Sequence, residues 1–87
     1  MLVFDLETDG LLNDLTQIHC LAIHDLSNNE TVVYNDQGTR DPIVRGITRL
    51  EEADRIAGHN IISFDIPCVQ KIFGFFNPQG EVIDTLL

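Results

Sequence analysis

The sequence has few basic residues and no long apolar run, and both shortages restrict what the chain can be. Lysine and arginine number 5 against 14 aspartates and glutamates, which gives a net charge of −9. A basic patch for phosphate binding is therefore not expected, so the chain could bind nucleic acid only where divalent cations supply positive charge. No window approaches the roughly 18 consecutive apolar residues of a membrane-spanning helix, so no membrane partner is expected.

Other common signals are missing as well. The N-terminus has no basic segment and reaches an acid at Asp5, unlike a secretory signal peptide, so a cytoplasmic setting is expected. Cys20 and Cys68 form neither a CxxC pair nor a cysteine–histidine spacing typical of zinc, and we expect both to be buried, reduced thiols. No repeat or linker interrupts the 87 residues, which are enough for one domain.

The first part of the chain has the alternation of β-strands. Apolar and polar residues alternate over residues 2–7, and further strands are predicted at 17–24 and 31–34. The cluster Ser27-Asn28-Asn29 lies between the second and third strands and is typical of a turn. These two strands are therefore predicted to form a hairpin.

Apolar residues then recur at three and four positions, which predicts helices. The first helix is expected from Ile43 to Ala57, with Gly58 ending it and residues 56–59 overlapping into a fourth strand. A second helix is expected from Asp65 to Phe73.

Residues 81–87 begin a further element that breaks off inside an apolar run, so the C-terminal end is expected to be a truncation. The order β-β-β-α-β-α followed by a fragment predicts an α/β fold with a mixed sheet and helices packed on it.

Asp5 and Glu7 are the most unusual pair in the sequence. Residues two apart on a strand point to the same face, with Cα atoms about 6.6–7 Å apart. Strands are depleted in acids, and two like charges this close repel unless a cation lies between them. A divalent metal such as Mg²⁺ or Mn²⁺ would supply that cation, whereas a solvent-facing pair at a strand end is the structural alternative.

A second acidic segment runs from Gly58 to Pro67, where a strand end passes through polar residues into a helix that begins at an acid. Asp65 is a candidate metal ligand in this position. The structural alternative is that Asp65 is an ordinary N-cap of the helix, and that His59 and Asn60 only satisfy a turn.

Three segments together resemble the DEDD family of 3′→5′ exonucleases. Residues 4–8 (Phe-Asp-Leu-Glu-Thr) resemble its first motif, and His59-Asn60 through Phe64-Asp65 resemble its second. The spacing within the second motif, and the Ile-Asp-Thr-Leu of residues 83–86, are most similar to the proofreading domain of podovirus-type family A DNA polymerases. The resemblance extends over nearly the whole chain.

This resemblance implies a ribonuclease H-like exonuclease fold, with residues 1–87 as the N-terminal portion of a 3′→5′ exonuclease domain. It implies that Asp5, Glu7 and Asp65 are catalytic metal ligands for two Mg²⁺ or Mn²⁺ ions. Four further residues match positions that contact the substrate strand: Thr8, Leu11, Asn60 and Phe64. The implied reaction releases mononucleotides from single-stranded or frayed DNA 3′ ends, within an infected bacterial host if a phage encodes the chain.

The family's third motif, a tyrosine or histidine with an aspartate four residues later, does not occur after Asp65. The fourth metal ligand is therefore expected outside this chain, and the isolated chain is expected to be inactive or feeble. A polymerase domain, another polypeptide or a second copy would complete the site. An exposed apolar surface and an unpaired sheet edge are also expected, and both would favour a homodimer.

Two alternatives remain open from the sequence. One is a DEDD exoribonuclease-like protein, because no residue distinguishes RNA from DNA by a contact to the 2′-hydroxyl. The other is a non-catalytic interaction module that retains the fold.

Overall fold

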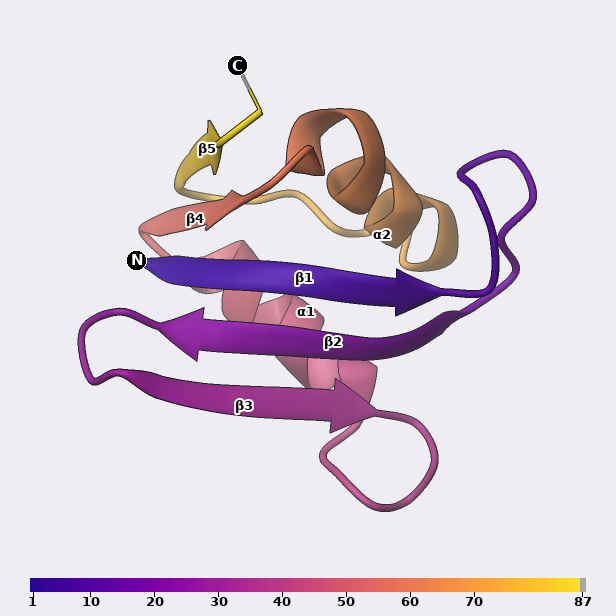
Figure 1. Ribbon diagram of the computed structural model, residues 1–87, viewed down its shortest axis with the longest axis horizontal. Coiled ribbons are helices and arrows are strands. Elements are labelled where there is room, and N and C mark those ends of the chain that lie inside the picture. The colour runs from indigo at the N-terminus through magenta and orange to yellow at the C-terminus, as the bar shows by residue number, and fades with distance from the viewer. Residues whose placement is uncertain (87) are drawn as a thin grey trace.

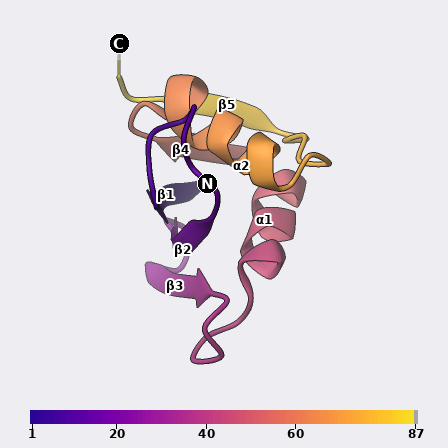
Figure 2. The ribbon, with the colours of Figure 1, turned by 90° about the vertical axis from the view of Figure 1, so that its right-hand side faces the viewer.

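The computed structural model describes residues 1–86, which form a five-stranded mixed sheet with the strand order β3-β2-β1-β4-β5. Figure 1 shows the antiparallel strands β1, β2 and β3 together, with β4 and β5 continuing the sheet beyond β1. The pairs β1–β4 and β4–β5 are parallel. Figure 2 shows α1 on one side of β1, β2 and β3. The predicted α/β fold with a mixed sheet is confirmed.

The three predicted strands and the hairpin are confirmed with small changes of boundary. Strand β1 is Leu2–Thr8, β2 is Ile18–Asp25 and β3 is Glu30–Asn35. Along β1 the even positions from Leu2 to Leu6 are buried, whereas the acids between and after them are exposed. The alternation of apolar and polar residues in the sequence therefore correctly predicts which side chains of β1 face the core and which face solvent.

The first helix is shorter than predicted. Helix α1 is Ile43–Glu52, and the residues expected to continue it form strand β4, Arg55–Gly58. Ala53 ends the helix with an extended backbone (ψ 146°), and Ile56 pairs in parallel with Leu2. Ile56 and Ala57 are two apolar residues in succession, which suit a strand buried on both faces as well as a helix. Pairing with β1 therefore decided that they form a strand.

The segment after β4 begins with a wide turn of helix. A π-helical turn, η1, covers Ile61–Asp65 and leads into α2, Ile66–Ile72, after which β5 covers Glu81–Asp84. The side chain of Asp65 makes no capping hydrogen bond to α2, so the N-cap alternative is wrong. The tail beyond Asp84 was predicted to continue to residue 87, and its last residue, Leu87, lies outside the described residues.

One hydrophobic cluster joins both helices to the inner face of the sheet. Ile43, Ile47 and Leu50 of α1 belong to it, together with Cys68 and Val69 of α2. Cys68 is buried as predicted, but Cys20 is partly exposed, and both thiols are free. No helix within residues 1–86 is long and apolar enough to cross a membrane.

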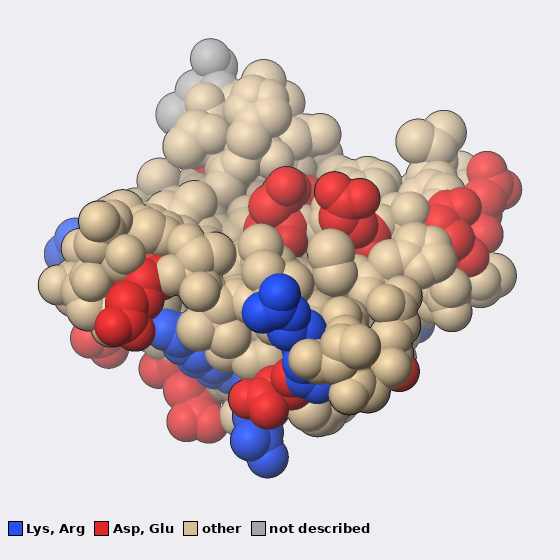
Figure 3. Space-filling model, turned by 60° about the horizontal axis from the view of Figure 1, so that its bottom comes forward, with Lys and Arg blue, Asp and Glu red and all other residues tan. Residues whose placement is uncertain are grey.

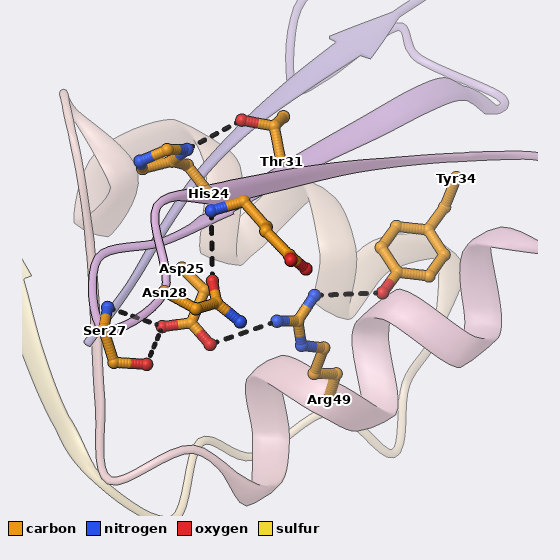
Figure 4. A network of polar contacts seen from close by, with 8 residues as sticks. His24, Asp25, Ser27, Asn28, Thr31, Tyr34 and Arg49 are labelled. Carbon is orange, nitrogen blue, oxygen red and sulfur yellow. Dashed lines mark hydrogen bonds and ion pairs between the residues drawn. The ribbon is translucent and has the colours of Figure 1, made fainter.

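A polar network attaches α1 to the hairpin on the inner side of the sheet (Figure 4). The Arg49 guanidinium donates to the Tyr34 hydroxyl at 3.2 Å and pairs with the Asp25 carboxylate at 3.5 Å. Asp25 also accepts hydrogen bonds from the amide and hydroxyl of Ser27. The network fixes how α1 sits across β2 and β3 and leaves the other end of β1 free for the acids.

Candidate functional site

Strand β1 holds Asp5 and Glu7 on the sheet face opposite the hydrophobic core. Both side chains are exposed, and their antiparallel neighbours on β2 are Ala22 and Cys20. Burial of the Cys20 thiol raises its pKa, and the negative charges of Glu7 and Asp5 raise it further, so both carboxylates lie near this thiol. Figure 3 shows acidic side chains in several separate groups over one face of the molecule.

Asp65 lies at the point where β4 stops running beside β1. Strand β4 pairs only with Leu2 and Val3 of β1, which leaves the following part of that edge of β1 without a strand partner. The backbone N–H of Leu6 lies near the Asp65 carboxylate on this edge and lowers the pKa of that carboxyl. The start of α2, and not a further strand residue, lies beside this edge of β1. Asp65 therefore lies next to the part of β1 that carries Asp5 and Glu7.

The environment of Asp65 is unfavourable for a carboxylate. Asp65 is 6% exposed and is the only buried charged residue within residues 1–86. Burial first, and then the charge of Asp5, raise the pKa of this carboxyl to about 6, although the nearby backbone N–H of Leu6 lowers it. Buried carboxyls with strongly perturbed pKa values and a like-charged neighbour concentrate at functional sites, because structure alone gains nothing from them.

The structure brings together part of the predicted ligand set. Asp5 and Asp65 are close enough for the charge of one to perturb the other, and Asp5 and Glu7 share a face of β1. In the part of the chain that the structure describes, however, no three His, Cys, Asp or Glu side chains are gathered closely enough to hold one ion. The three-carboxylate metal site therefore stays a prediction, with Asp5 and Asp65 as the pair that the fold juxtaposes.

The four residues predicted to contact substrate lie in two segments around this pair. Thr8 ends β1 at a register shift and donates a hydrogen bond to the carbonyl of Gly10 at 2.8 Å. Leu11 is 74% exposed on the following loop. Asn60 adopts a left-handed backbone (φ 60°) before η1, whereas Phe64 packs partly against the core. Of the four, Leu11 is the most accessible apolar contact for a base.

Side-chain hydrogen bonds close the loop that carries Leu11. The Asp9 carboxylate accepts the backbone N–H groups of Thr16 at 2.9 Å and Gln17 at 3.2 Å, and also the Thr16 hydroxyl. Lys71 of α2 donates to the carbonyl of Leu12 at 2.9 Å. The sequence marked Asp9 only as part of a turn, and no local signal connects Lys71 to a loop 59 residues away.

We expect Asp9→Ala to open this loop. Hydrogen bonds from Thr16 and Gln17 lower the pKa of Asp9 to about 2, so the carboxylate accepts them throughout the neutral range. Because the pKa of Asp9 in the folded chain is below the ordinary value of 3.8, these bonds contribute stability above pH 4, and the contribution is lost as the pH falls through about 2. Amide hydrogen exchange at Thr16 and Gln17 should rise about tenfold in the variant. Equal rates in Asp9→Ala and in the exposed control Asp14→Ala would contradict this.

A cleft of about 330 Å³ lies elsewhere, at the start of β1, where Met1, Arg49 and Arg55 contribute to its lining. None of the predicted site residues lines it, and both arginines already pair with acids, Arg49 with Asp25 and Arg55 with Glu81. The acidic end of β1 is therefore the better candidate site.

Comparison with known proteins identifies the family of the fold. The model of the RNase_H superfamily matches residues 2–86. The chain belongs to the RNase_H superfamily. The predicted ribonuclease H-like fold is thereby confirmed.

Two relatives extend the comparison. The DNA-directed DNA polymerase of Escherichia phage T7 is 29% identical over 93 residues, which cover 100% of this chain and 13% of that polymerase. The structure of the family B DNA polymerase from the hyperthermophilic archaeon Pyrobaculum calidifontis matches with a TM-score of 0.60 and 26% identity. That match covers 84% of this chain and 11% of the archaeal chain. The chain is thus similar to a small part of each polymerase.

Proposed function

We propose that this chain is the N-terminal portion of a metal-dependent 3′→5′ exonuclease domain of a phage-type DNA polymerase. The observation that carries the proposal is the buried Asp65 carboxylate, with its pKa raised to about 6, held beside Asp5. Two carboxylates in this arrangement repel each other when both are ionised, and a divalent cation between them removes the repulsion. The membership in the RNase_H superfamily and the two polymerase relatives support a nucleic acid as the substrate.

The residues of the chain divide into two roles. Asp5 and Asp65 would hold the cations, and rotation of the exposed Glu7 side chain would add a third carboxylate from the same face of β1. Bound Mg²⁺ or Mn²⁺ ions supply an activated water and stabilise the charge that develops during phosphodiester cleavage. Leu11 would pack against the terminal base of the 3′ end, while Thr8 and Asn60 would hydrogen-bond the strand.

Metal binding is the most direct test. Titration of the chain with Mn²⁺ in a calorimeter should give a binding isotherm that Asp5→Ala and Asp65→Ala each weaken by at least about tenfold. Mn²⁺ should also raise the melting temperature of the unmodified chain, because a ligand that binds only the folded state stabilises it. Asp54→Ala removes an exposed acid before β4 and serves as the control. Unchanged binding in both site variants would contradict the proposal.

Cleavage provides the second test. Residues 1–87 contain no third motif, so we expect only feeble release of mononucleotides from a labelled DNA single strand with Mg²⁺ or Mn²⁺. Activity should be restored when a polymerase segment or a second chain supplies the missing metal ligand. Labelled RNA of the same sequence, assayed in parallel, distinguishes an exoribonuclease. Robust turnover by the pure monomer would show that the site is complete without a partner.

One observation favours a second candidate, a non-catalytic interaction module. Residues 1–86 bring no three potential metal ligands into one group. If the calorimetric titration shows that the chain and both site variants bind Mn²⁺ equally weakly, this candidate replaces the exonuclease.

A further inference from the structure

The carboxylate of Asp84, at the end of β5, binds three backbone amides. Its oxygens accept the N–H groups of Asn60 at 2.9 Å, Ile62 at 3.0 Å and Leu86 at 2.8 Å. These hydrogen bonds lower the pKa of Asp84, so the group is ionised at neutral pH and the bonds are charge-assisted. A carboxylate that already accepts three N–H groups has little capacity left to bind a cation.

Two of these amides belong to the segment that leads to Asp65. Asn60 adopts the left-handed backbone that begins η1, and its carbonyl accepts the N–H of Phe64 at 3.1 Å. The first N–H groups of a helical turn have no partner within the turn, and Asp84 supplies one for Asn60 and for Ile62. The entry to η1 is therefore fixed from outside by a side chain on another strand.

The sheet places Asp84 where it can do this. Parallel pairing of β4 with β5 sets Asp84 opposite Gly58, the last residue of β4. Figure 1 shows the two strands as neighbours at the edge of the sheet. Just after β5, the N–H of Thr85 donates a hydrogen bond to the carbonyl of Gly58 at 2.9 Å. Both strands thus end together, and the carboxylate reaches across to the residues that follow β4.

We propose that Asp84 is a positioning residue of the candidate site, which holds the segment from Asn60 to Asp65 so that the Asp65 carboxylate faces Asp5. It acts through backbone amides and binds neither the metal nor the substrate. The expected effect on metal binding rests on the proposed function. The hydrogen bonds that Asp84 accepts from Asn60 and Ile62, called the Asp84 clamp below, can be tested without that function. Asp84 lies within residues 83–86, a segment that resembles the polymerase proofreading domain, but the resemblance implied no role for this residue.

The test compares Asp84→Asn with Asp54→Asn, which removes the same charge at the opposite end of the β4–β5 pair. In Asp84→Asn, amide hydrogen exchange at Asn60 and Ile62 should rise about tenfold, and the dissociation constant for Mn²⁺ should rise about tenfold. Asp54→Asn should change neither. A uniform rise in exchange along the whole chain would show a general loss of stability and would overturn the positioning role.

Asp84→Glu separates position from charge and provides a second variant if Asp84→Asn folds poorly. It keeps the negative charge but moves the oxygens by one methylene, so Mn²⁺ binding should weaken in it as well. Wild-type Mn²⁺ affinity in Asp84→Glu, with weak binding in Asp84→Asn, would mean that charge alone matters and would overturn the proposal. If the unmodified chain binds no Mn²⁺, the proposed function fails, and the exchange rates at Asn60 and Ile62 still decide whether the clamp exists.

Discussion

Gly80→Ala is expected to lower the free energy of unfolding by about 3 kcal/mol or more, a large part of the stability of a domain this size. A Cβ atom at position 80 would collide with the backbone carbonyls of Ala53 and Asp54. Hydrogen bonds on either side fix this approach, because Gln79 donates to the carbonyl of Glu51 at 2.9 Å and Glu81 to that of Asp54 at 2.8 Å. The backbone itself would have to move, and that would displace the start of β5.

Thermal and urea unfolding check this prediction. The melting temperature should fall by about 15 °C, since each 1 kcal/mol shifts it by about 4–8 °C in a domain of this length. Gly74→Ala is the matched control, because the nearest atom to its new Cβ is the Gln70 carbonyl oxygen at 3.9 Å, an ordinary contact distance. If Gly80→Ala has the same melting temperature and the same urea midpoint as Gly74→Ala, the close approach of β5 to the end of α1 is not as described.

Asp65→Asn is expected to stabilise the metal-free chain by about 2 kcal/mol at pH 7, after allowance for solvent screening beside the exposed Asp5. Burial and the charge of Asp5 raise the pKa of Asp65 from 3.8 to about 6 in the folded chain. Below pH 4 both the folded and the unfolded states are protonated and no cost arises. Between pH 4 and 6 the unfolded state ionises first, so stability falls, and above pH 6 the folded state carries the whole cost.

Urea unfolding of the metal-free chain between pH 4 and 8 measures this effect. The free energy of unfolding of the unmodified chain should fall from pH 4 to pH 6 relative to that of Asp65→Asn. The control Asp54→Asn should show the same pH dependence as the unmodified chain. Mn²⁺ at neutral pH should reverse the order of stability of the two proteins, because the chain with Asp65 binds the ion more tightly than Asp65→Asn does. A stability difference that does not change with pH would show that Asp65 is not strained in the folded state.

The alternation along β1 and the hairpin of β2 and β3 were predictable because each depends on local spacing and on a nearby turn. The end of α1 was not, because apolar residues at 53, 56 and 57 suit a helix face and a buried strand equally. Parallel pairing of Ile56 and Ala57 with Leu2 and Val3 decided the outcome. Such pairing connects residues more than 50 positions apart, and no local pattern reports it.

The same division applies to the acids. Asp5 and Glu7 could be placed on one face from the two-residue period of a strand alone. The resemblance to the DEDD family followed from three short segments taken together, each of them readable in the sequence. Asp65 also admitted an N-cap interpretation, and only the folded chain shows a buried carboxyl that makes no capping hydrogen bond and lies near the backbone N–H of Leu6. Its raised pKa depends on burial and on the charge of Asp5, which are properties of the assembled structure.

By itself the sequence determined the order of most elements, the superfamily and the identity of the acids, because these follow from periodicity and from short motifs. Only the tertiary structure decided which acids meet, how the Leu11 loop is closed and how Asp84 holds the entry to η1. The amides that Asp84 binds at Asn60 and Ile62 lie 24 and 22 residues away along the chain. Contacts of that separation depend on how β4 and β5 are aligned in the sheet, and no local periodicity contains that information.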